Sequence, residues 1–89
     1  GVLLRLQNNI KTRLVAQEKF ADAAKVGTRM LRLAPINWQL AREAALLHAR
    51  AGSYRAAQAV LNGFATRASD AADRTAAEKL AAKLAQALH

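Results

Sequence analysis

The sequence predicts an all-α fold in which five antiparallel helices stack as helical hairpins. Apolar residues recur at spacings of three and four in five separate segments, which is the pattern of amphipathic helices. The chain also resembles itself at an offset of 34 residues, so that Phe20 falls on Tyr54 and Ala23 on Ala57. No stretch alternates apolar and polar residues as a half-buried strand would. Each copy is therefore predicted to form a helix, a tight turn and a second helix.

The first helix is expected over residues 2–16. The chain enters it at Gly1 without a capping side chain, which we interpret as a sign that an N-terminal domain is missing. Its apolar sector is wider than one neighbouring helix can cover, so part of it should lie bare and drive self-association through Val2, Leu3 and Leu6. The stripe expected to face the core consists of Leu3, Leu6, Ile10 and Leu14.

A second helix is expected over residues 20–33, after the turn at 17–19, where Glu18 falls on Gly52 in the 34-residue offset. Pro35 should end it, because proline lacks an amide proton and disfavours helical geometry in the residue before it. The residues expected to point inward are Phe20, Ala23, Val26, Met30 and Leu33.

The second copy repeats this arrangement. Asn37 is a credible N-cap for a third helix over 38–51, and Gly52 should end that helix as a left-handed residue. Ser53 is expected to cap a fourth helix over 54–67. The inward residues of this fourth helix are expected to be Tyr54, Ala57, Val60, Leu61 and Phe64.

Ser69 or Asp70 should open a fifth, alanine-rich helix. Its outer side is polar, as a terminal repeat requires, so we expect it to act as the solvating cap of the stack. Its apolar face is expected to comprise Ala77, Leu80, Ala81, Leu84 and Leu88. The chain is then one domain, 1–89, divided into a first repeat at 1–35, a second repeat at 36–69 and a capping helix at 70–89.

The spacing and the aromatic residue that opens each second helix resemble the tetratricopeptide repeat (TPR). In that family small residues occupy the places where the helices of a hairpin touch, and Ala23, Ala45 and Ala57 match them. The resemblance implies a right-handed α-α superhelix and a non-catalytic protein-interaction module. Lys11 departs from the pattern, because it stands where a small residue is expected, and so does Gly27, where an aromatic residue is common.

A narrower resemblance rests on residues 4–11, LRLQNNIK, followed by two repeats with MLRLAP at 30–35 between them. These segments look like the C-terminal tail of SirB-type bacterial proteins, in which a transglutaminase-like domain precedes the repeats. That resemblance implies the alternative function, an accessory segment that stabilises the transglutaminase-like domain in the same polypeptide. We expect the protein to be cytoplasmic.

Composition and residue types argue against several other functions. Fourteen Lys and Arg against six Asp and Glu give a formal charge of +8, but the basic residues are spread along every segment, which argues against a nucleic-acid-binding patch. Cysteine is absent, and no apolar run is long enough to span a membrane. No nucleophile, carboxylate pair or ligand cluster indicates a catalytic, metal or cofactor site, and His48 is expected to pack between helices.

The surface expected to bind a partner is the concave face that the first helices of successive TPR hairpins share. Arginines there would bind carboxylates of an acidic peptide through charge-assisted hydrogen bonds, while amide side chains bind its backbone. The alternative is that this face is only solvated. By the repeat register it is lined by Arg5, Asn8, Thr12, Val15, Gln39, Arg42, Leu46 and Arg50.

Four single residues carry further expectations. The stem of Lys11 should lie along the helix pair with its ammonium reaching water. Trp38 should pack at the junction between repeats, and would be a binding hot spot if it were exposed. The adjacent Asn8 and Asn9 are poor helix formers, so either they contact a missing domain or partner, or their side chains cap a neighbouring turn.

Overall fold

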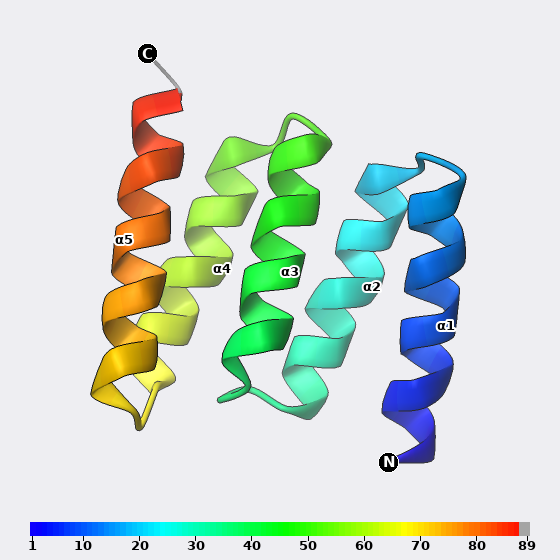
Figure 1. Ribbon diagram of the computed structural model, residues 1–89, viewed down its shortest axis with the longest axis horizontal. Coiled ribbons are helices and arrows are strands. Elements are labelled where there is room, and N and C mark those ends of the chain that lie inside the picture. The colour runs from blue at the N-terminus through cyan, green and yellow to red at the C-terminus, as the bar shows by residue number, and fades with distance from the viewer. Residues whose placement is uncertain (88–89) are drawn as a thin grey trace.

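The structure is a computed structural model that describes residues 1–87, and five α-helices make up its regular structure (Figure 1). The predicted fold class is confirmed. The third helix ends one residue earlier than predicted, and Leu88 and His89 lie outside the described residues. In chain order the helices are α1 (Val2–Ala16), α2 (Phe20–Leu33), α3 (Trp38–Arg50), α4 (Tyr54–Arg67) and α5 (Ala71–Ala87).

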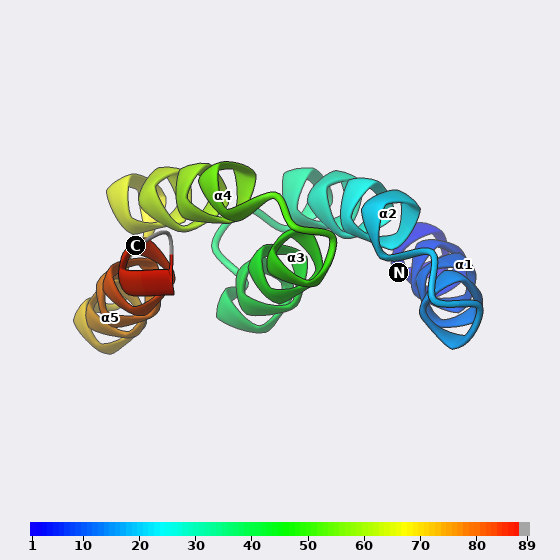
Figure 2. The same ribbon diagram turned by 90° about the horizontal axis from the view of Figure 1, so that it is seen from above.

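The helices form two layers, with α2 and α4 in one and α1, α3 and α5 in the other (Figure 2). Each helix packs against the next along the chain, and α3 also contacts α5. The molecule is consequently a thin slab of 31 × 29 × 14 Å. This layering leaves α1, α3 and α5 to share the inner face.

Side-chain caps begin two of the helices. Asn37 Oδ1 accepts a hydrogen bond from the amide of Leu40 at 3.2 Å, which confirms Asn37 as the cap of α3. Asp70 Oδ1 accepts one from the amide of Ala72 at 2.8 Å, so Asp70 rather than Ser69 opens α5. Ser53 occupies the N-cap position of α4, as predicted, but its side chain makes no capping hydrogen bond.

The turns that close the two hairpins have the same backbone conformation. Gly52 has a φ of 85°, as predicted, and Glu18, which falls on it in the 34-residue offset, has a φ of 58°. In both copies the next residue donates to a carbonyl five residues back, which is the long bond of a Schellman motif. These bonds run from Lys19 N to Leu14 O at 2.9 Å and from Ser53 N to His48 O at 2.8 Å.

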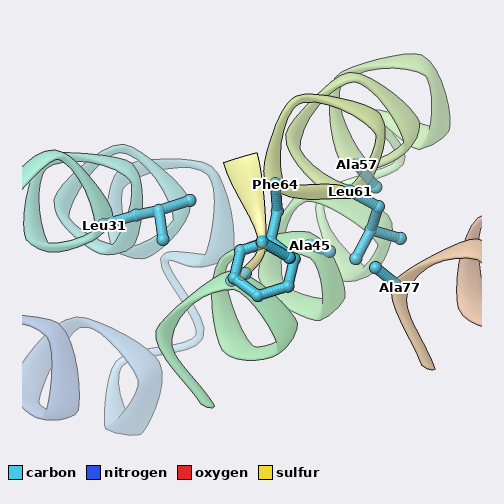
Figure 3. Close-up of a cluster of buried hydrophobic side chains, with 8 residues drawn as sticks. Leu31, Ala45, Ala57, Leu61, Phe64 and Ala77 are labelled. Atoms are coloured by element: carbon cyan, nitrogen blue, oxygen red, sulfur yellow. The ribbon is translucent and has the colours of Figure 1, made fainter. Parts of the chain in front are cut away.

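The larger core cluster lies where α3, α4 and α5 meet (Figure 3). Phe64 and Leu61 are fully buried at its centre, and the small side chains of Ala45 and Ala77 let the helices approach them. Trp38 packs against Phe64 with ring centroids 5.5 Å apart, so the predicted packed position of Trp38 is confirmed.

Two expectations about burial were wrong. Leu33 is exposed, because α2 ends at that residue and the chain turns away at Pro35 before α3 begins. In α1 the stripe expected to be buried is largely exposed, and the helix instead turns its neighbouring face inward. That inward face carries Leu4, Gln7, Lys11 and Leu14.

Candidate functional site

The inner face holds a groove of about 710 Å³. Side chains from α1, α3 and α5 line it, together with the first residue of α4. We call this the inner groove. Its lining residues are Asn8, Lys11, Thr12, Val15, Glu43, Leu46, Leu47, Ala49, Arg50, Tyr54, Leu84 and Ala87.

The inner groove brings together five of the residues that the repeat register placed on the concave face. Asn8, Thr12 and Val15 come from α1, and Leu46 and Arg50 come from α3. The hydroxyl of Thr12 donates to the backbone oxygen of Asn8 at 2.8 Å, one turn earlier in the same helix. The groove therefore combines amide, hydroxyl, cationic and apolar groups in one place.

Arg5, Gln39 and Arg42 do not line the inner groove. All three are exposed, and they lie nearer the start of α1 or α3 than the lining residues of the same helix. Arg50 is therefore the arginine that the structure places in the groove.

Lys11 and Glu43 form an ion pair that crosses the floor of the inner groove from α1 to α3. Lys11 is only 7% exposed, and its ammonium pairs with the carboxylate of Glu43. The prediction that this ammonium reaches water was therefore wrong. Because Lys11 is buried but paired, the repeat register stands. Lys11 falls on Ala45 in the 34-residue offset, and Ala45 is fully buried. A lysine at a position expected to be buried was therefore the signal in the sequence that Lys11 needs a partner of opposite charge.

Arg50 lies over an aromatic ring at the edge of the inner groove. Its guanidinium carbon is 4.6 Å from the centroid of the Phe20 ring, which is a cation–π geometry. Stacking uses the face of the guanidinium, so the N–H groups around its edge can still donate to a carboxylate. Phe20 thereby fixes the orientation of Arg50.

His48 packs between α3 and α2, which confirms its predicted role. Its Nε2 lies 3.1 Å from the hydroxyl of Thr28, and that hydroxyl donates to the backbone oxygen of Ala24 at 3.0 Å. With the hydroxyl proton directed to Ala24, this arrangement favours the tautomer of His48 in which Nε2 carries the proton and donates to Thr28. Burial lowers the pKa of His48 from its ordinary value, because the charged form loses hydration.

Comparison with known proteins establishes the family. The model of a family described as tetratricopeptide repeat matches residues 10–82. The chain belongs to the TPR family. No curated protein and no solved structure matches the chain. TPR membership indicates a protein-interaction scaffold, and TPR repeats are typically non-catalytic.

The TPR register explains the exposed face of α1. Ile10 corresponds to Ala44 of the next repeat, and Ala44 packs so closely on α2 that a Cβ added at Gly27 would lie 3.4 Å from it. Leu3 and Leu6 lie on the same stripe as Ile10 and, like Val2, are more than half exposed. The outer stripe of α1 (Val2, Leu3, Leu6 and Ile10) thus corresponds to the face that in α3 contacts a preceding helix.

Within residues 1–87 no group of three His, Asp or Glu side chains is arranged to hold a metal ion. None of the five described helices is long and apolar enough to cross a membrane.

Proposed function

We propose that this TPR chain is a scaffold that binds an extended acidic peptide in its inner groove. The observation that carries the proposal is the convergence of Asn8, Thr12, Leu46 and Arg50 on one groove of about 710 Å³. A peptide bound there would be held by polar groups at its backbone and by one charge-assisted contact to an acidic side chain.

Each lining group has a role in this proposal. The Asn8 amide can donate to and accept from a peptide backbone, and Arg50, held by Phe20, can donate two parallel hydrogen bonds to a carboxylate. Leu46 offers an apolar contact beside them. Glu43 would repel an acidic ligand, but its charge is offset by Lys11.

The test is a titration of labelled acidic and basic peptide pools at low and physiological ionic strength. We expect acidic peptides to bind more tightly and to weaken as salt rises, because exposed charges are screened beyond about 8 Å at physiological ionic strength. Asn8→Asp should weaken acidic-peptide binding about threefold to tenfold, since it places a negative charge in the groove. Asn9→Asp is the matched control, because Asn9 is exposed and does not line the groove.

A second matched pair separates local contact from net charge. Arg50→Gln and Arg5→Gln each remove one positive charge, but only Arg50 lines the inner groove. Equal losses for the two variants, or equal binding of acidic and basic pools, would contradict the proposal. Tight, salt-sensitive binding of duplex DNA would instead support the nucleic-acid alternative.

The outer stripe of α1 favours a second function, docking onto another apolar surface. That surface would be a second copy of the chain, or the transglutaminase-like domain that the resemblance to SirB-type proteins implies. Val2, Leu3 and Leu6 are 74%, 53% and 55% exposed, and such apolar patches tend to find partners.

Sedimentation of the chain across a range of concentrations tests self-association. We expect dimers that a Leu3→Glu, Leu6→Glu double variant abolishes. Ile36→Glu is the control, because Ile36 is an equally exposed apolar residue outside α1. A chain that stays monomeric at every concentration would contradict the homodimer.

A further inference from the structure

A second groove is lined mainly by residues of α2 and α4, with His48 from α3, and none of its residues line the inner groove. It consists of two adjoining hollows of about 480 and 430 Å³, which share Thr28, Arg32, Ala59 and Val60. We call the two together the outer groove. Most of the lining residues come from α2 and α4, which are neighbours in the outer layer (Figure 2).

The floor of the outer groove is made of small and apolar side chains. From α4 it is lined by Ala56, Ala59, Val60 and Gly63, which recur at spacings of three and four on one stripe. Gly63 is a residue that internal packing does not require, since a Cβ added there would meet only the mobile end of Arg67, at 3.6 Å. A glycine within a helix costs about 1 kcal/mol relative to alanine. This small-residue floor permits close approach by a second backbone.

The walls of the outer groove are cationic. Lys25, Arg29 and Arg32 follow one another along α2 at spacings of four and three, and Arg67 lies across from them on α4. All four are exposed, and no Asp or Glu is among the described residues that line the two hollows. Like charges at such spacings repel one another by a few tenths of a kcal/mol, so an anionic partner laid along α2 would relieve that repulsion.

We propose that the outer groove binds an acidic amphipathic helix of a partner protein. The partner would place a small apolar face on the floor near Ala59 and Gly63, and its carboxylates, spaced three and four apart, would pair with Lys25, Arg29 and Arg32. The proposal goes beyond the inner-groove function, because the two grooves share no lining residue.

A nucleic acid fits this surface less well. Its phosphates would pair with the cations, but the floor between them is mostly apolar, and the described lining offers no Phe, Tyr or Trp ring for a base to stack on. Its one imidazole, that of His48, is engaged with the hydroxyl of Thr28. An amphipathic helix satisfies both the apolar floor and the charged walls.

The probe is a synthetic helical peptide of the length of α2, with Ala and Leu on one face and Glu at spacings of three and four beside it. A peptide of the same composition in scrambled order, a short DNA duplex and vesicles of anionic lipid are the comparison ligands. Binding is followed by fluorescence anisotropy and by the amide resonances of the protein. We expect the ordered peptide to bind at least about tenfold more tightly than the scrambled one, and to shift the resonances of Ala59 and Gly63.

Two variants locate the contact. Arg29→Glu should weaken binding about tenfold or more, whereas Arg55→Glu, a charge reversal on α4 outside the groove, should change it less than about threefold. Gly63→Leu should block the floor, and Asn62→Leu is its control, because Asn62 is an exposed neighbour that does not line the groove.

The outcomes are distinguishable. Equal binding of ordered and scrambled peptides, or shifts confined to the inner groove, would overturn the proposal. So would displacement of the peptide by the duplex or the vesicles at equal charge. If Gly63→Leu fails to fold, the comparison of Arg29→Glu with Arg55→Glu still decides whether the peptide binds in the outer groove. Asn8→Asp, which tests the inner groove, should leave this binding unchanged.

Discussion

The ion pair between Lys11 and Glu43 gives the most direct test of the structure. Glu43→Gln keeps the shape of the side chain but leaves Lys11, a residue that is only 7% exposed, without a counter-charge. Breaking a fully buried pair in this way costs about 3–5 kcal/mol, and an exposed pair contributes about 0–1 kcal/mol. The Glu43 side chain is 44% exposed, so water partly solvates the site. We therefore expect a loss near the middle of these limits, about 2 kcal/mol.

Urea unfolding followed by circular dichroism measures this loss, and thermal unfolding provides a second readout. For a domain of this size about 2 kcal/mol corresponds to a fall in Tm of about 8–16 °C. Lys11→Met fills the same space without a charge, so its cost should stay below about 1 kcal/mol. In that background Glu43→Gln should have little effect, since no buried ammonium remains. Glu78→Gln, at an exposed position in α5, is the control and should change stability by less than about 0.5 kcal/mol.

The double-mutant cycle decides the interpretation. If Lys11→Met and Glu43→Gln add without coupling, the two side chains do not interact in solution. If Lys11→Met costs as much as Glu43→Gln, the loss comes from removing the ion pair itself, and the argument from an uncompensated charge is refuted.

Three further predictions concern the two hairpin turns, His48 and Gln7. Glu18→Gly should raise the free energy of unfolding by about 0.5–1 kcal/mol, and Gly52→Ala should lower it by about 1 kcal/mol, because both positions have a positive φ. Urea unfolding measures both changes, and changes of the same sign would contradict a turn conformation shared by the two hairpins. Burial lowers the pKa of His48 below 6.5, so the unfolded chain binds its proton more readily. Stability is then fully present above pH 6.5 and falls as pH drops from there through the folded pKa; His48→Gln should flatten that slope, and an unchanged slope would show that another group titrates. The Oε1 atom of Gln7 is buried and accepts no hydrogen bond, so Gln7→Leu should stabilise the fold by about 1 kcal/mol in the same unfolding assay, and a loss of stability would show that the amide makes a needed contact.

The helices and their turns could be predicted from the sequence because local chemistry decides them. Apolar spacing located all five helices, Pro35 closed α2, and Gly52 ended α3 in the left-handed conformation. The 34-residue offset also aligned Glu18 with Gly52. A glutamate by itself does not indicate a left-handed φ, so this conformation of Glu18 could be inferred only from the glycine at the same place in the second copy. The offset also placed five residues of the inner groove correctly on the inner face.

The rest depends on which helices lie opposite one another. Lys11 and Glu43 are 32 residues apart, and nothing in either helix alone says that the one reaches the other across the groove floor. The same reason applies to Arg5 and Arg42, which share the register of the groove but lie beyond its end, and to Leu33, whose apolar side chain has no helix over it.

The sequence by itself determined that this chain is a stack of TPR hairpins, because periodicity, turn residues and an internal repeat are local properties of the chain. Only the tertiary structure decided which face of α1 is buried. Several faces of α1 are apolar enough to be buried. Which of them is buried depends on the contact with α2 and on the ion pair between Lys11 and Glu43 of α3. Burial is a property of pairs of helices, and periodicity within one helix cannot fix it.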